Sequence, residues 1–143
     1  MLSLTCKTAI KAVILLASQP EGDTKLSLKE ISEAIGASSH TVGKFLQTLV
    51  RHAVIKSVKG PAGGFFITKA QKDQSIMSIV EAIDGKQIFT GCGLGLSQCS
   101  EAHPCPIHDQ YKEIRDAMDK LFGDNTIASL CQSVHIGETY LLG

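Results

Sequence analysis

Three cysteines and a histidine lie within 17 residues in the second half of the chain, in the order Cys92, Cys99, Cys105 and His108. Thiolate and imidazole groups are ligands of both zinc and iron–sulfur clusters. The spacing differs from the paired C-x2-C motifs of zinc ribbons and ferredoxins. The residues therefore predict a metal site and leave three states open: a structural zinc ion, an iron–sulfur cluster, or reduced thiols without a ligand.

The segment that carries these cysteines, residues 91–106, is rich in Cys, Gly, Ser and Pro, which predicts an irregular loop. Its glycines make the backbone pliable enough for distant thiols to converge on one metal. The other two cysteines, Cys6 and Cys131, lie on apolar helical stretches, and we expect them to be packed core thiols.

Two short helices joined by a tight turn follow a first helix over residues 5–18. Ser27 and Glu30 form a capping box at the start of the first of the two, and Gly36 ends it. A short gap after Gly36 leads to the second helix. Its apolar side chains between Val42 and Val50 follow the i, i+3, i+4, i+7, i+8 pattern of an amphipathic helix. This order predicts a helix-turn-helix.

Two β-prone segments, Val54–Val58 and Phe65–Thr68, come next and enclose a glycine-rich tip, which predicts a β-hairpin. A helix-turn-helix followed directly by a hairpin is the order of a winged helix. The predicted fold is mainly α with a small β-hairpin wing. Its expected parts are a winged helix-turn-helix DNA-binding domain (1–85), a cysteine-rich sensor loop (86–106), and a long dimerisation helix with a C-terminal tail (107–143).

Five apolar residues after the cysteine loop are spaced by 4, 3, 4 and 3 positions, which is a heptad pattern. They are Ile107, Tyr111, Ile114, Met118 and Leu121. Left in water, this seam would be a sizeable apolar patch. We therefore expect a second copy of the chain to cover it, which makes the protein a homodimer.

The formal net charge of zero conceals two halves of opposite sign. Up to Lys72 there are ten Lys and Arg against four Asp and Glu, a net charge of +6, and the remainder carries −6. A basic half suits a polyanion such as double-stranded DNA. A single helix with a basic face is, however, more often simply exposed to solvent. The candidate DNA contacts are Ser38, His40, Thr41, Lys44 and Arg51 on the second helix of the motif, with Lys59 and Gly60 in the hairpin tip.

Composition excludes several classes of protein. The 143 residues are 43% hydrophobic, enough for one packed core, and no apolar run approaches the ~20 residues of a membrane span. With no signal cleavage pattern, we expect a cytoplasmic protein that does not contact a membrane. We find no convergent nucleophile and base, so we expect no enzyme. A small electron-transfer protein is the alternative from another class, but it would have no use for a basic wing.

Five segments resemble, in order, the Rrf2-type (IscR- and NsrR-like) winged helix-turn-helix regulators of bacteria. The most specific part is the Lys-Gly-Pro-x-Gly-Gly wing combined with the downstream cysteine loop. The matching segments are residues 5–13, 26–32, 58–65 and 79–85 and the loop with the three cysteines.

The resemblance implies a homodimeric DNA-binding transcriptional repressor whose long helix crosses that of its partner. In many members the three cysteines hold an iron–sulfur cluster, commonly of the two-iron two-sulfur (2Fe-2S) type, which senses iron–sulfur or redox status or nitric oxide. By position, Cys92, Cys99 and Cys105 would be thiolate ligands and His108 the fourth ligand. Structural zinc or free thiols in the same DNA-binding regulator remain the alternative.

The chain departs from the family pattern at two places. Lys7 stands where some relatives have an acidic fourth ligand, and a cation cannot serve in that role, which favours His108. The recognition helix has Gly43 and Lys44 where iron–sulfur members often have Glu and Gln. The operator sequence is therefore not inherited from the resemblance.

Overall fold

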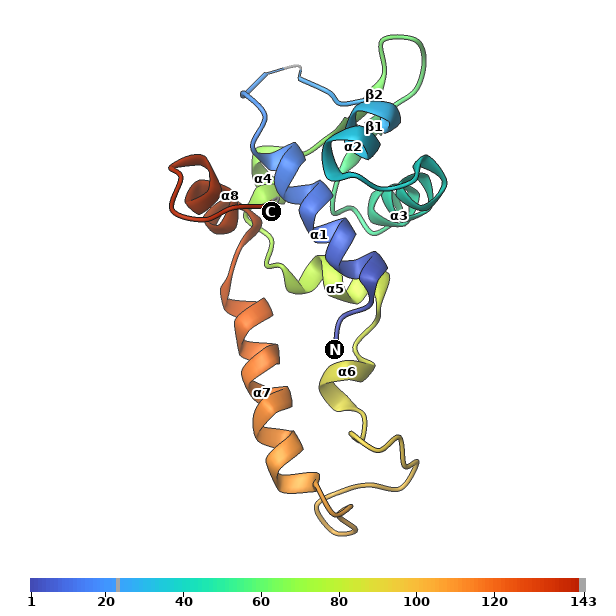
Figure 1. Cartoon of the computed structure of the whole chain (residues 1–143), viewed down its shortest axis with the longest axis vertical. Coiled ribbons are helices and arrows are strands. Elements are labelled where there is room, and N and C mark those ends of the chain that lie inside the picture. Colours follow the sequence, from blue (N-terminus) through green and yellow to red (C-terminus); the bar gives the residue numbers. More distant parts are fainter. Residues whose placement is uncertain (23, 142–143) are drawn as a thin grey trace.

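A computed structural model describes residues 1–22 and 24–141 of the chain. Figure 1 shows a helical body with the β-hairpin at one end, and the longest helix and the cysteine loop extending from the opposite end. None of the described helices is long and apolar enough to cross a membrane. The elements are α1 (Leu4–Ala17), α2 (Leu28–Ile35), α3 (Ser39–Arg51), β1 (Lys56–Val58), β2 (Gly64–Phe66), α4 (Lys69–Lys72), α5 (Met77–Ile83), α6 (Gln87–Thr90), α7 (His108–Asp124) and α8 (Ile127–His135).

The core forms around α1, which packs against α2 and α3 as well as α5 and α8. Ala9 and Ala12 are fully buried, and their small side chains let the neighbouring helices approach closely. Cys6 is also fully buried, and Cys131 packs against the core from α8, as the sequence predicted. Burial, helped by Asp84, raises the pKa of the Cys6 thiol to about 12, so this thiol stays protonated and unreactive.

The helix-turn-helix is formed by α2 and α3. Ser27 and Glu30 make the predicted reciprocal capping box at the start of α2. Gly36 ends α2 with φ at 66°, a left-handed conformation that glycine adopts without strain. Ser38 caps α3 by accepting a hydrogen bond from the Thr41 backbone N–H.

The wing is a two-stranded antiparallel sheet in which Lys56 pairs with Phe66 and Val58 with Gly64. Its strands are shorter than predicted because Val54 and Ile55 are buried in the core instead. A Cβ atom on Gly63 would lie 2.0 Å from the Val58 carbonyl oxygen, so only glycine fits in this tip.

The end of α5 is tied to the start of α1. The Asp84 carboxylate accepts hydrogen bonds from the Ser3 backbone N–H at 2.8 Å and from the Ser3 hydroxyl at 2.5 Å. Ser3 in turn caps α1 by accepting from the Cys6 backbone N–H. The segment that leads into the cysteine loop therefore begins at a fixed point on the central helix.

The segment around the cysteine loop differs in two ways from the sequence expectation. The sensor loop expected over residues 86–106 begins with a single helical turn, α6, which precedes the irregular part of the loop. After α7 the chain returns to the body, where Ile76 N–H donates to Asn125 O and Ile127 N–H donates to Gln74 O. Ile127 is fully buried, so α8 contributes to the core, as expected for the helical stretch that carries Cys131, although the sequence had grouped it with the C-terminal tail.

The predicted heptad seam lies on α7 and its N-cap, on a helix that projects from the body (Figure 1). None of the described residues of α7 is buried in the single chain. Ile114 and Leu121 each expose more than half of their surface. The seam is therefore open at Ile114 and Leu121 in one copy of the chain, whereas Tyr111 packs against the cysteine loop.

Candidate metal centre and nucleic-acid interface

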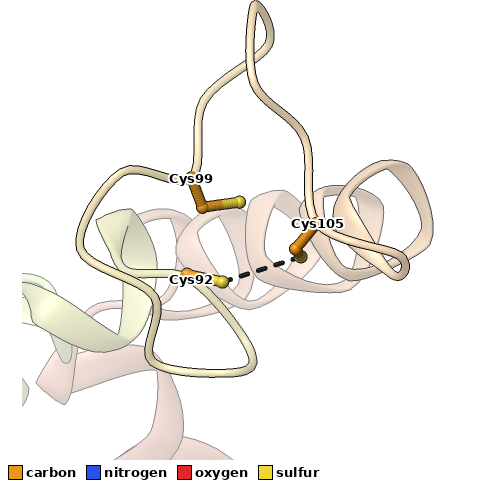
Figure 2. A group of neighbouring side chains, drawn as sticks. All are labelled: Cys92, Cys99 and Cys105. Carbon is orange, nitrogen blue, oxygen red and sulfur yellow. Dashed lines mark hydrogen bonds between the residues drawn. The ribbon is translucent and has the colours of Figure 1, made fainter.

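The structure brings three thiols together at the far end of the molecule. Figure 2 shows Cys92, Cys99 and Cys105 reaching toward one another from separate turns of the loop. Their Sγ atoms all lie within 4.8 Å of one another, and those of Cys92 and Cys105 are 3.6 Å apart. Cys105 is buried and the other two are half-buried. The loop therefore presents three soft donors to a common point.

His108 stands beside this cluster as the first residue of α7. Its Nδ1 atom is 3.1 Å from the Cys99 Sγ atom. Its Nε2 atom is buried and has no hydrogen-bond partner among the described residues. The ligand atoms that all lie within 4.8 Å of one another are those of the three cysteines, so His108 stands beside this group without belonging to it. The role of His108 as a ligand remains a prediction.

Side chains on one face of α7 hold the loop in place. Arg115 donates from Nη1 to the carbonyl oxygens of Thr90 at 3.2 Å and Gly91 at 2.7 Å, directly before the first cysteine. Lys112 forms an ion pair with Glu101 at 2.9 Å, which ties down the second part of the loop.

The sequence reasoning missed these supporting residues, although a signal was present. His108, Tyr111, Lys112 and Arg115 have the spacing i, i+3, i+4, i+7 that places side chains on one face of a helix. Tyr111 uses this face to pack against Gly93, where a Cβ atom would lie 2.8 Å from the ring. The backbone between Cys92 and the next turn of the loop can therefore lie flat on the tyrosine.

The thiols differ in their readiness to ionise. Hydrogen bonds from the backbone N–H groups of Leu96 and Leu94 lower the pKa of Cys92 to about 7, against the opposing effect of desolvation. For Cys99 the Cys105 backbone N–H favours the thiolate, but desolvation and the two neighbouring thiols outweigh it and raise the pKa. Crowded thiolates repel one another, and a bound cation relieves that repulsion.

The donor set fits both kinds of metal group that the sequence left open. Two thiolates on one tetrahedral metal lie roughly 3.8 Å apart, given metal–sulfur bonds of about 2.3 Å. The 3.6 Å separation of Cys92 and Cys105 matches that spacing. Thiolate with imidazole is suited to zinc or to an iron–sulfur cluster.

The candidate DNA contacts are all on exposed surface. Among the described residues, no ion pair involves Lys44, Arg51 or Lys59, so their charges remain available for phosphates. The hairpin tip lies at the opposite end of the molecule from the cysteine loop, with α3 beside the hairpin (Figure 1). The exposed candidates are Ser38, His40, Thr41, Lys44, Arg51, Lys59 and Gly60.

Known proteins share the sequence pattern and the fold of this chain. A family model described as Rrf2, iron-dependent transcriptional regulator, matches residues 2–133. An rrf2-like HTH-type transcriptional regulator from Rhodobacter capsulatus is 32% identical over 121 residues, covering 80% of this chain and 81% of the relative.

Two solved structures show the same fold. CymR (YrzC), the global cysteine regulator of B. subtilis, superimposes with a TM-score of 0.74 at 20% identity, over 92% of this chain and 96% of that one. IscR of T. potens has a TM-score of 0.74 at 18% identity, over 97% and 91% of the two chains. These matches confirm the predicted winged helix-turn-helix fold. The proteins found are transcriptional regulators and not enzymes, as the sequence predicted.

Gly93→Ala tests whether the contact with Tyr111 positions the thiols. The new methyl group would collide with the ring, so we expect the loop to shift and metal retention to fall by about 10-fold, as is usual when groups supporting a metal site are lost. Iron and zinc contents after incubation with a chelator give the measurement. Gly123→Ala is the control, because a Cβ atom there meets nothing within 4 Å. Equal metal retention by the two variants would contradict the assignment.

Proposed function

Because the chain belongs to the Rrf2 family of transcriptional regulators, we propose that it binds DNA as a homodimer and that an iron–sulfur cluster in its cysteine loop controls its affinity for DNA. The observation that carries the proposal is the convergence of three Sγ atoms within 4.8 Å, with the His108 ring beside them. The family description names iron, which favours an iron-containing group over zinc.

The recognition helix α3 and the wing divide the DNA contacts between them. His40, Thr41 and Lys44 lie in the first half of α3, where short polar and basic side chains reach base edges in the major groove. Arg51 at the end of α3 and Lys59 in the wing contact backbone phosphates. In one copy these groups meet one half-site, and a dimer meets two half-sites about one helical turn apart or a multiple of it.

Two further candidates act through the backbone. Ser38 is the N-cap of α3, and a helix N-terminus favours a nearby phosphate through its partial positive charge. Gly60 has φ at 104°, which a side chain would strain, and its missing Cβ atom lets the wing approach the DNA closely.

Lys59→Ala tests the phosphate role of the wing. Loss of one phosphate contact should weaken binding to all DNA sequences alike and reduce the salt slope of log K by ~0.9. Binding to specific and nonspecific duplexes, each measured over a range of salt concentrations, gives both quantities. Lys120→Ala on α7 removes an equal charge far from the wing and should leave the slope unchanged. A changed sequence preference with an unchanged slope for Lys59→Ala would refute the role.

The four proposed cluster ligands form two close pairs. Cys92 and Cys105 approach to 3.6 Å, and Cys99 and His108 approach to 3.1 Å. Two pairs of donors suit a two-iron two-sulfur (2Fe-2S) cluster, in which each iron takes two protein ligands. When bound, such a cluster supplies an iron centre whose state responds to oxidants. His108 would be the most weakly held ligand because an imidazole can be protonated.

The loop position explains how occupancy of the site can reach the DNA-binding surface. The loop joins α6, which follows the Asp84 contact with α1, to α7, which carries the dimer seam. Ordering the loop therefore fixes the angle between α7 and the body. The ligand shifts this arrangement only by its differential affinity for the two states. We expect a coupling on the order of 1–3 kcal/mol between site occupancy and DNA binding.

A structural zinc ion is the second candidate for the same residues. The compactness of the thiol group supports it, because the three Sγ atoms lie within 4.8 Å of one another and the Cys92–Cys105 pair has the spacing of ligands of one tetrahedral ion. In that case the loop would be ordered permanently, and the regulator would respond to a partner protein or to thiol oxidation.

Metal analysis after anaerobic reconstitution distinguishes the candidates. We expect iron and sulfide together in the native chain, their loss in Cys99→Ala, and their retention in Cys131→Ala, which removes a thiol outside the site. His108→Ala should still bind the cluster but release it faster. Stoichiometric zinc without sulfide would establish the second candidate. Equal DNA affinities of the loaded and empty forms would remove the regulatory role of the cluster.

The seam on α7 supports the homodimer. Leu121 continues from the seam into an apolar groove that Ile10, Ile76, Phe122 and Leu130 also line. The apolar side chains of a second copy of the seam can cover the seam and this groove together.

Replacing Ile114 and Met118 together with Glu should convert the dimer into monomers, because charged groups in the seam would lose their hydration on association. Sedimentation velocity measures the change. Lys120→Glu changes the charge of the same helix outside the seam and should leave the dimer intact. A dimeric double variant would contradict the seam assignment, and a monomeric native chain would contradict the dimer.

A further inference from the structure

We propose that Cys92 and Cys105 form a disulfide when the metal-free chain meets a peroxide, so that the metal site is also a reversible thiol switch. The choice of these two thiols stands on their geometry alone. The consequence for cluster binding rests on the proposed function.

The distances select this pair among the thiols of the chain. The Sγ atoms of Cys92 and Cys105 are in contact at 3.6 Å, as the dashed line in Figure 2 marks. A disulfide bond of about 2.05 Å requires them to approach by roughly 1.5 Å more, which side-chain rotation and small shifts of the loop can supply. The loop around Cys92 is exposed and contains several glycines, so it can make that shift.

The remaining thiols are held elsewhere. The Cys99 Sγ atom lies 3.1 Å from the His108 ring, so this thiol has a competing partner. Cys6 is fully buried in the core on α1. Cys131 lies on α8, which follows the end of α7 that is farther from the loop and packs against α1.

The two selected thiols have unequal surroundings that suit successive steps. Cys92 is half-buried, within reach of a small oxidant, and its Sγ atom accepts a hydrogen bond from the Leu94 backbone N–H at 3.4 Å. Cys105 exposes only 7% of its surface, so it meets the oxidised partner more readily than the solvent.

The reaction balances with hydrogen peroxide as the two-electron oxidant. The Cys92 thiolate attacks one peroxide oxygen, the O–O bond breaks, and hydroxide leaves, which produces a sulfenic acid on Cys92. The Cys105 thiol then attacks this sulfur, the S–O bond breaks, and the S–S bond forms. The oxygen leaves as water with the Cys105 proton. The two thiols lose two electrons, and the peroxide is reduced to water.

The disulfide removes two of the three thiolates from the metal site. One remaining thiolate and an imidazole cannot replace the three-thiolate donor set, so the oxidised chain should take up no cluster. A dithiol reductant reverses the bond by exchange and restores the site. Oxidation of the metal-free chain therefore delays reloading until reducing conditions return.

The test treats the metal-free chain of 143 residues with hydrogen peroxide and blocks the remaining thiols with N-ethylmaleimide. The disulfide is then reduced, and the released thiols receive iodoacetamide. Trypsin cuts after Lys86 and Lys112 and yields one peptide that carries all three site cysteines. Fragmentation of this peptide should show iodoacetamide on Cys92 and Cys105 and N-ethylmaleimide on Cys99.

Two variants and one reconstitution complete the test. Cys99→Ser should form the disulfide as the native chain does, and Cys105→Ser should lose it. Predominant pairing through Cys99, or sulfinic acid on Cys92 with Cys105 still blocked by N-ethylmaleimide, would overturn the proposal.

Iron and sulfide are then supplied to reduced and peroxide-treated chains. A mapped disulfide in a chain that takes up no cluster when reduced would refute the proposed cluster while leaving the switch. Cluster uptake without any disulfide would refute only the switch.

Discussion

Burial of α1 is the constraint on which the other parts of the molecule depend. Its small and apolar side chains are enclosed by α2 and α3 on the DNA-binding side and by α5 and α8 on the other. Apolar burial on this scale provides most of the stability of a small domain. Asp84 then joins the first turn of α1 to the end of α5, from which the cysteine segment departs. One helix thus supports both the helix-turn-helix and the start of the segment that carries the three cysteines.

The cysteine loop has a different physical basis, because polar contacts hold it in place. Arg115 and Lys112 secure it to α7 through hydrogen bonds and one exposed ion pair. A hydrogen bond contributes about 1 kcal/mol net, and an exposed ion pair contributes less. Such a loop is ordered only weakly by itself, so ligation or a disulfide changes its stability considerably. This balance suits a sensor, in which a small chemical event must alter the arrangement of a helix.

The separation of charge along the chain follows the same division of labour. Ten of the fourteen basic residues lie in the half that forms α1 to α3 and the wing, while α7 carries five acidic residues against three basic ones. Phosphates repel a net negative helix, so this distribution of charge favours the proposed orientation, in which α3 and the wing face the DNA and α7 points away from it. The proposed dimer seam and metal site then remain free of the DNA.

Features that depend on residues close together in the sequence could be predicted from the sequence alone. The capping box at Ser27, the stop at Gly36 and the glycine-rich wing are local, since each hydrogen bond or backbone conformation involves residues a few positions apart. The cysteine spacing likewise predicted a metal site. Three other features appear only when the chain folds: Asn125 and Ile127 pair with the segment before α5, Asp84 binds the cap residue Ser3, and Arg115 supports the loop. These contacts join residues 24 to 81 positions apart, and no local pattern records which distant partner a side chain will meet when the chain folds back on itself.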